Sequence, residues 1–245
     1  MVSLFRNSSN PSYEDLMQSD YYYELGRSAN SEGNYKKAIK YFTKSLSYNS
    51  KEPEAFNNRG VCYYKLKEFN KAINDFNKAL SINPNKANSL NNRSSCYSEL
   101  GMLKEALYDS RKAVELQPNN AIFVLGLGWT LYQMKSYEEA LKYFNEAIEL
   151  DRYYYKAFHN RGLTYYHLCQ FEKALDDFNY CIQKGSEEGV EIEGLWELLQ
   201  HRGKVYYEMK QYSNAVDDWE RAVKLYPRLE SELREKINEA KEKLN

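Results

Sequence analysis

Apolar residues return along most of this chain in a pattern that combines helical spacing with a much longer period. Over residues 54–86 they recur every three to four residues in two runs, and the polar break at Lys67 and Glu68 separates the runs. Such spacing is typical of amphipathic helices, so this stretch predicts two antiparallel helices joined by a short turn. The whole pattern begins again 34 residues later, as the step from Ala72 to Ala106 illustrates.

Seven positions carry the pattern. Small residues are needed where the two helices of a pair approach most closely, and large residues fill the space beside them. In the stretch just described the seven positions hold Gly60, Tyr63, Phe69, Ala72, Phe76, Ala79 and Pro84. Proline at the last position ends the second helix, because it lacks an N–H and disfavours helical geometry in the preceding residue.

Six such repeats can be placed along the chain, and one insertion interrupts them. We place the repeats at residues 19–52, 53–86, 87–120, 121–154, 155–188 and 196–229, with the insertion at 189–195. A single helix pair cannot bury its own apolar face, so each repeat is expected to stack on the next. The pattern resembles the tetratricopeptide repeat. The resemblance covers nearly all of the chain and implies an all-α, right-handed superhelical solenoid of antiparallel helix pairs, whose first helices line a concave face that holds a peptide or a protein partner.

Three segments lie outside the repeats. Residues 1–18 are rich in serine and asparagine, without a period, and are expected to form a disordered leader whose last residues extend the first helix. The insertion at 189–195 is interpreted as a tolerated loop. An alternative is an acidic contact element that uses Glu187, Glu188, Glu191 and Glu193.

The C-terminal segment, residues 230–245, predicts a helix. Together with Leu229, it has apolar residues at steps of three and four, with charged residues between them: Leu229, Leu233, Ile237, Ala240 and Leu244. We expect this helix to cap the exposed end of the sixth repeat, as a solenoid requires. A partner-binding amphipathic helix is the alternative.

Composition limits the function further. The formal net charge of −1 does not favour nucleic acid as a partner, since phosphate binding needs a clustered basic excess. The absence of a long apolar run predicts no membrane segment. Of the 4 cysteines, Cys62 and Cys96 hold the same place in successive repeats and Cys181 replaces an alanine, which indicates small buried residues in a reducing compartment. A cytoplasmic location is therefore expected.

One pair of positions co-varies among the six repeats. Where arginine precedes the small residue of the first helix, aspartate precedes the aromatic position of the second helix in the same repeat. The four pairs are Arg59 with Asp75, Arg93 with Asp109, Arg161 with Asp177, and Arg202 with Asp218. The other two repeats carry Leu25 with Tyr41 and Leu127 with Tyr143. We expect each arginine to pair with its own aspartate in a structural, partly buried ion pair.

The concave face offers candidate ligand-binding residues. Family geometry places the second, fifth, sixth, ninth, twelfth and thirteenth residues of each first helix there. The sixth place holds Asn58, Asn92 and Asn160, which resembles the asparagine ladder of the O-linked N-acetylglucosamine transferase superhelix, where side-chain amides clamp a peptide backbone. Asparagines that face only solvent are the alternative.

Apolar residues gather at the same places in the fourth and fifth repeats. They are Leu125, Trp129, Tyr132, Leu163 and Tyr166. A tryptophan with apolar neighbours on this face favours a pocket for a partner. The alternative is that the curvature of the solenoid or the leader covers Trp129.

The family's best-known peptide site is not favoured by this sequence. A clamp for the acidic C-terminal tail of a chaperone would need lysine and arginine at places that here hold Tyr23, Arg27, Asn58, Asn88 and Asn92. Lysine is absent from all five of these places. We therefore expect a different protein or peptide partner.

No enzyme chemistry is predicted. His159 and His167 share one predicted helix and His201 lies in the next repeat, without a metal-binding or nucleophile motif around them. We predict no catalytic residues, no cofactor and no metal. The sequence favours an adaptor or scaffold that binds a peptide or protein in its concave groove. A structural assembly subunit that uses its convex face or ends is the alternative, and Ser110 in place of an aromatic residue gives it some support.

Overall fold

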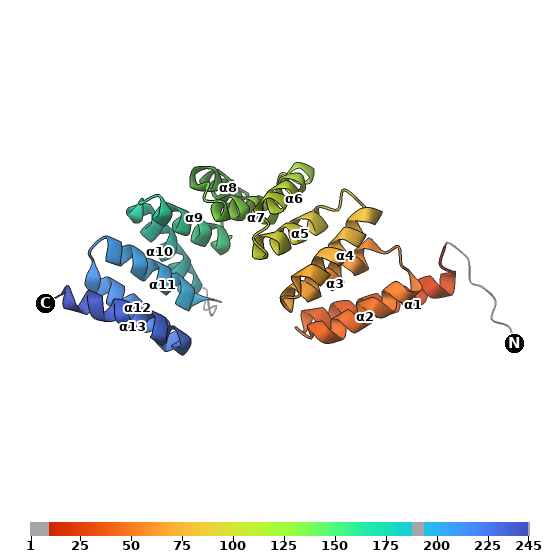
Figure 1. Cartoon of the computed structure of the whole chain (residues 1–245), viewed down its shortest axis with the longest axis horizontal. Helices are drawn as coiled ribbons and strands as arrows, with labels where there is room; N and C mark the ends of the chain where they lie inside the picture. Colours follow the sequence, from red (N-terminus) through yellow and green to blue (C-terminus); the bar gives the residue numbers. More distant parts are fainter. Residues whose placement is uncertain (1–9, 188–193, 245) are drawn as a thin grey trace. The chain divides into compact units, whose positions relative to one another are not determined.

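The computed structural model describes residues 10–187 and 194–244 of the chain. Within these residues the fold is entirely helical, and no strand occurs. In this described part of the chain, twelve α-helices follow one another as six antiparallel pairs, and a short 3-10 helix (Pro227–Leu229) and a thirteenth α-helix follow the last pair (Figure 1). The first three pairs are α1 (Tyr13–Ser31) with α2 (Tyr35–Tyr48), α3 (Pro53–Lys65) with α4 (Phe69–Ile82), and α5 (Ala87–Glu99) with α6 (Leu103–Leu116). The others are α7 (Ala121–Gln133) with α8 (Tyr137–Leu150), α9 (Tyr155–His167) with α10 (Phe171–Glu187), and α11 (Leu195–Glu208) with α12 (Tyr212–Leu225), followed by α13 (Glu230–Glu242).

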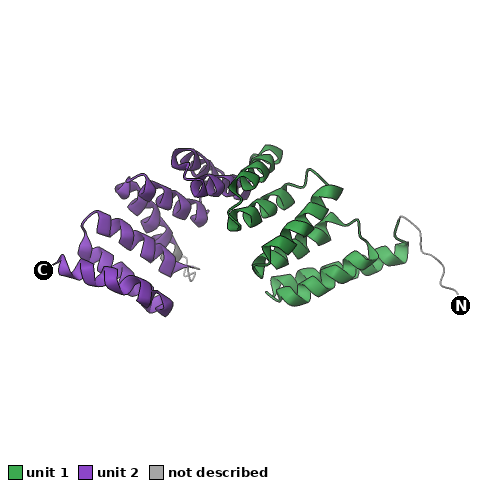
Figure 2. Ribbon diagram, viewed as in Figure 1, with its two compact units in different colours: residues 1–118 green, residues 119–245 purple. Residues whose placement is uncertain are grey.

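The chain forms two compact units, which Figure 2 shows in different colours: unit 1 at residues 1–118 and unit 2 at residues 119–245. In unit 1, α1 contacts α3 and α3 contacts α5, while the second helices α2 and α4 contact α3 and α5, respectively. In unit 2, α7 contacts α9 and α9 contacts α11, while the second helices α8 and α10 contact α9 and α11, respectively. The first helices therefore form one layer of each unit, which we call the inner layer, and the second helices form the other.

A glycine and an aromatic ring fix how closely the two helices of a pair approach. A Cβ atom added at Gly60 would lie 2.7 Å from Phe76 Cε1, and one added at Gly128 would lie 2.7 Å from Phe144 Cε1. These distances are too short for carbon atoms in contact, so only glycine fits beside the ring. The third repeat packs differently, because Ser94 replaces the glycine and Ser110 replaces the aromatic ring. Ser94 Oγ donates to Ala106 O of the second helix at 2.8 Å.

The turn inside each pair contains one residue in the left-handed backbone region. Gly33 and Gly101 adopt φ values of 74° and 73° there. Non-glycine residues adopt φ values of 56–61° at the equivalent position of the other four pairs, namely Lys67, Lys135, Cys169 and Lys210. This conformation strains a residue with a Cβ atom, so these four turns are held by the packing of the helices around them.

Helix α13 covers the end of the last pair. Leu233, Ile237 and Ala240 are buried in one cluster with Leu199 of α11 and Trp219 of α12. The apolar stripe predicted from the sequence is correct in these places. Its last member, Leu244, is 52% exposed because α13 ends at Glu242.

The ends of the predicted segments differ from the helix bounds. The last residues of the expected leader, 1–18, extend the first helix: α1 begins at Tyr13, where Ser12 and Asp15 form a capping box in which Ser12 Oγ accepts from Asp15 N at 3.1 Å and Asp15 Oδ2 accepts from Ser12 N at 3.1 Å. Residues 1–9 lie outside the described part of the chain, as do residues 188–193 of the expected insertion and acidic contact element. The six repeat borders stay a prediction.

Candidate functional site

All four arginine–aspartate pairs are brought together by the structure. Arg93 Nε donates to Asp109 Oδ2 at 2.6 Å, and Arg93 Nη2 donates to Asp109 Oδ1 at 2.7 Å. The other three pairs have the same two-bond geometry, with distances of 2.7–2.8 Å: Arg59 with Asp75, Arg161 with Asp177, and Arg202 with Asp218. Each pair joins the first helix of a repeat to its second helix.

The two halves of each ion pair differ in burial. The side chain of Asp109 is 1% exposed, whereas that of Arg93 is 18% exposed. Burial works against the charged guanidinium of Arg93, but the hydrogen bonds and charge of Asp109 together raise its pKa. Burial raises the pKa of Asp177, and Arg161 partly offsets this effect. The aspartates are thus buried carboxylates that depend on their arginines.

Each arginine also makes a third bond that the sequence analysis missed. Arg93 Nη1 donates to Asn77 Oδ1 of the preceding repeat at 2.6 Å. The equivalent bonds of the other arginines go to Thr43, Asn145 and Asn179, at 3.0, 2.7 and 2.7 Å. The arginines therefore join neighbouring repeats as well as the helices of one repeat.

The asparagines of unit 1 are engaged with each other and with a tyrosine. Asn58 Nδ2 donates to Tyr23 OH at 2.9 Å, and Asn92 Nδ2 donates to Asn57 Oδ1 at 3.2 Å. In both bonds the fifth place of one first helix meets the sixth place of the next. Ser89 Oγ also donates to Asn57 Oδ1, at 2.9 Å. The side-chain amides that were expected to bind a peptide backbone therefore already make hydrogen bonds within unit 1.

Asn160 differs from the other two asparagines. The fifth place of the preceding repeat holds Leu125, which has no polar side-chain atom to meet it. Among the described residues, the Asn160 side chain makes no hydrogen bond. The backbone carbonyl of Asn160 accepts from Thr164 Oγ1 at 2.7 Å. Its amide is thus available to a ligand at the inner layer of unit 2.

A cavity of about 490 Å³ opens in unit 2 beside this layer. Its apolar lining comes from five helices, and three of its residues were predicted as partner contacts: Tyr132, Leu163 and Tyr166. Phe178 and Trp219 also line it. Burial raises the pKa of Tyr132 to about 12, so its hydroxyl stays neutral. We call this space the unit 2 cavity.

The other two predicted apolar contacts lie differently. The Trp129 ring stacks on that of Tyr132, with centroids 5.1 Å apart and 17° between the planes, so it supports a cavity wall without lining it. Leu125 is 8% exposed, which corrects its assignment as a surface contact.

Charged side chains line the same cavity on the side of α11 and α13. They are Lys204 and Glu208 on α11, and Lys236 and Glu239 on α13. Burial lowers the pKa of Lys204, and the nearby charge of Lys236 lowers it further. Glu239 Oε1 already accepts from Tyr207 OH and from Lys243 Nζ, the latter at 2.8 Å. Neither lysine of the cavity makes a hydrogen bond or ion pair among the described residues, so both can meet an anionic group.

Two of the three histidines also meet in unit 2. His159 Nε2 lies 3.1 Å from His201 Nδ1, and His201 lines the cavity. As in the asparagine contacts, the fifth place of one first helix, His159 in α9, contacts the sixth place of the next first helix, His201 in α11. These two histidines are 42 residues apart rather than the 35 of the asparagine contacts, because the insertion adds seven residues between them. This spacing was the signal that could have found the pair in the sequence.

Comparison with known proteins agrees with this architecture. Models of the tetratricopeptide repeat match residues 19–52, 53–86, 76–108, 125–154 and 196–229, which together make up more than half of the chain. The chain belongs to the tetratricopeptide repeat family. No curated protein matches it. Tetratricopeptide repeats generally mediate contacts between proteins or the assembly of complexes. None of the described helices combines the length and apolar character needed to cross a bilayer.

Several solved structures share this tetratricopeptide repeat fold. Pseudomonas aeruginosa pilF is 21% identical over 87% of this chain and 94% of its own, with a TM-score of 0.72. The Cut9–Hcn1 hetero-tetramer of the APC/C gives 15% identity over 93% of this chain and 43% of the matched chain, with a TM-score of 0.81. YrrB, described as a tetratricopeptide repeat protein with an unusual peptide-binding site, gives 21% identity over 76% of this chain and 92% of its own, with a TM-score of 0.55. At these identities the likeness shows the fold alone.

Proposed function

We propose that this protein is an adaptor that binds a peptide or protein segment at the inner layer of unit 2. The observation that carries the proposal is the unit 2 cavity, whose volume of about 490 Å³ falls within the usual range of ligand sites. Six of its twelve lining residues are apolar or aromatic, and the other six are histidines, lysines and glutamates. Such a lining suits one apolar side chain of a partner as an anchor.

The charges at the cavity define the partner further. Lys204 and Lys236 lie close enough for their charges to repel each other, and the carboxylates of Glu232 and Glu197 act on Lys204 in the opposite sense, so an anionic group of a ligand would be attracted by both lysines. Asn160 offers a donor and an acceptor to the backbone of an extended segment. The proposed ligand is therefore a segment with an apolar side chain next to an aspartate, a glutamate or a C-terminal carboxylate. The proposal assigns no catalytic role to the chain.

Peptide selection on the purified protein tests the proposal. Peptides are selected from a random library, and their affinity is measured by fluorescence polarisation for the native protein and for two cavity variants, Tyr166→Ala and Lys236→Glu. We expect about a tenfold or greater loss of affinity in Tyr166→Ala, since buried aromatic contacts dominate such sites. Lys236→Glu should weaken acidic peptides in particular.

Matched controls lie on other surfaces of the same unit. Tyr153, which is 70% exposed, and Lys224 on α12 do not line the cavity. Tyr153→Ala and Lys224→Glu should leave the affinities unchanged. If the selected peptides bind both cavity variants as well as the native protein, the cavity is not the binding site.

A role in complex assembly is the second candidate, and one observation in unit 1 favours it. Helix α1 exposes apolar side chains at steps of three and four: Tyr13 (79% exposed), Leu16, Met17 and Tyr21 (59% exposed). A stripe of this kind is typical of a surface that packs on another chain. Ser110 does not support this candidate, because the third repeat has Ser94 in place of the glycine and therefore has no room for an aromatic ring at position 110. Co-purification of a stable complex that is lost in Met17→Asp, but kept in Tyr166→Ala, would support assembly through α1.

A further inference from the structure

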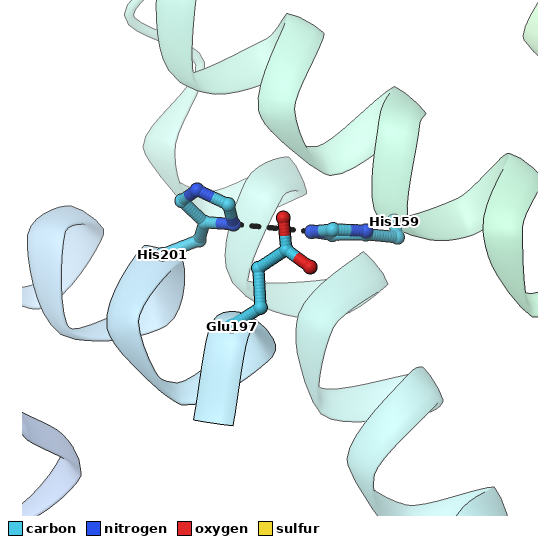
Figure 3. A group of neighbouring side chains, drawn as sticks. All are labelled: His159, Glu197 and His201. Atoms are coloured by element: carbon cyan, nitrogen blue, oxygen red, sulfur yellow. Dashed lines mark hydrogen bonds between the residues drawn. The ribbon is translucent and has the colours of Figure 1, made fainter. Parts of the chain in front are cut away.

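Three side chains with metal-ligating atoms converge at the α9–α11 contact. His159 comes from α9, whereas Glu197 and His201 lie four residues apart on one face of α11. One ligand atom from each residue, a ring nitrogen of each histidine and a carboxylate oxygen of Glu197, lies within 4.8 Å of the other two. Figure 3 shows the Glu197 carboxylate beside the gap between the two imidazole rings. The other histidine of the chain, His167, is not part of this cluster.

The nitrogen atoms already have nearly the spacing of metal ligands. At Zn–N distances of 2.0–2.1 Å, two ligands of a tetrahedral zinc ion lie about 3.3 Å apart. His159 Nε2 and His201 Nδ1 are 3.1 Å apart and share a hydrogen bond, so a zinc ion at this spacing would take the place of the shared proton. Glu197 is the exposed member of the three, and its flexible side chain can bring a carboxylate oxygen to the same centre.

The protonation state of the pair suits a cation. Imidazole is mostly neutral near pH 7, and the neutral ring is the form that binds a metal ion. The hydrogen bond between the facing nitrogens needs one proton there; once the protons lie on His159 Nδ1 and His201 Nε2, both facing nitrogens present a lone pair, and Glu197 supplies a carboxylate.

We propose that His159, Glu197 and His201 form a zinc-binding site. Two imidazoles and one carboxylate are the ligand set of open zinc sites, in which water or another ligand takes the fourth position. The nitrogen ligands disfavour Mg²⁺ and Ca²⁺, which prefer oxygen. The site does not depend on peptide binding, although His201 also lines the unit 2 cavity.

One neighbouring charge opposes the bound ion. Lys204 lies near both Glu197 and His201, and its positive charge acts on both groups. A zinc ion would be repelled by this charge. The site is therefore expected to bind zinc more tightly when Lys204 is replaced by the uncharged methionine.

Calorimetric titration of the chelator-treated full chain with ZnCl₂ tests the site. We expect one zinc ion per chain for the native protein. His159→Ala and His201→Ala should each weaken binding by more than about 100-fold, since even residues behind the metal ligands are worth 10- to 100-fold. The control His167→Ala should bind zinc as the native protein does. Addition of Co²⁺ should give the visible absorption of a tetrahedral site, and His201→Ala should abolish it.

Variants on the exposed side keep the test independent of folding. Glu197→Gln preserves the shape of the side chain but removes its charge, and it should weaken zinc binding while the helical content measured by circular dichroism stays unchanged. Glu208→Gln on the same helix is its matched control, and Lys204→Met should tighten binding. The proposal is overturned if the native protein binds no zinc, if His201→Ala or Glu197→Gln retains native affinity, or if His167→Ala loses it.

Discussion

Arg202 Nη1 donates to Asn179 Oδ1 at 2.7 Å, across a stretch of chain that is longer than in any equivalent contact. These two residues are 23 positions apart, whereas Arg161 and Asn145 are 16 apart. The difference equals the seven residues of the expected insertion at 189–195. The insertion therefore leaves the contact between α10 and α11 unchanged, and the stacking of the fifth and sixth repeats continues across it.

The arginine–aspartate pairs predict an asymmetric cost of mutation. Arg93→Ala leaves the buried Asp109 carboxylate without its partner and should lower the free energy of unfolding by about 3–5 kcal/mol. Asp109→Ala should cost less, about 1–3 kcal/mol, because Arg93 is partly exposed and keeps Asn77 as an acceptor. Urea denaturation followed by circular dichroism measures both values.

The chain supplies its own control for this pair. The fourth repeat carries Leu127 and Tyr143 at the two positions, so Arg93→Leu with Asp109→Tyr copies an arrangement that this fold already contains. We expect the double variant to unfold within about 1 kcal/mol of the native protein, since buried ion pairs and apolar residues of similar volume are often equivalent. Additive losses in the double variant would contradict the coupling of the two residues.

The strained turns predict gains in stability from glycine. Lys135 adopts φ 61° where Gly33 and Gly101 stand in other repeats. Lys135→Gly removes a left-handed penalty of about 1 kcal/mol, which the greater freedom of glycine in the unfolded chain partly offsets. A net gain of about 0.5 kcal/mol is expected in urea denaturation. Gly101→Lys is the reverse experiment, and an unchanged midpoint in both variants would show that these turns are not strained.

The two serines of the third repeat predict a compensating pair. Ser110→Phe alone places a ring against the Cβ atom of Ser94, where the equivalent distance at Gly60 is 2.7 Å, and should destabilise the protein by about 1–3 kcal/mol. Adding Ser94→Gly opens the space and should restore most of the loss. Thermal unfolding of both variants checks this expectation, and equal melting temperatures would disprove the packing rule.

The cysteines are expected to differ in reactivity. Burial raises the pKa of the Cys62 thiol to about 11 and those of Cys96 and Cys181 to about 12, so these thiols are neither accessible nor ionised near pH 8. Cys169 is exposed in the turn before α10. A thiol reagent should therefore modify one cysteine in the native protein and all four after denaturation, and Cys169→Ser should abolish the native reaction.

Contacts within a repeat were largely predictable from the sequence. Six copies of one pattern act as an internal alignment, so a contact such as Arg93 with Asp109 appears as a co-variation between two positions. The small residue beside the ring, as at Gly60 and Phe76, appears in the same way. Both depend only on the helix period and on residues of one helix pair, which the amino-acid order specifies.

Contacts between repeats were not predictable to the same extent. The asparagines were expected to face a ligand, but Asn92 bonds to Asn57 because neighbouring first helices bring the fifth and sixth places together. Leu125 was expected at the surface and is buried. The contact between His159 and His201 was not predicted for the same reason: a fifth place contacts the sixth place of the next first helix, and the insertion lengthens the distance in sequence between them.

The sequence by itself determined that this protein is a chain of helix pairs and which residues join the two helices of each pair, because these properties repeat with a period that can be read directly. Only the tertiary structure decided which side chains of neighbouring repeats meet, and where the unit 2 cavity and the His159–Glu197–His201 cluster lie. Those features combine side chains from several helices, and their positions depend on how each repeat packs on the next.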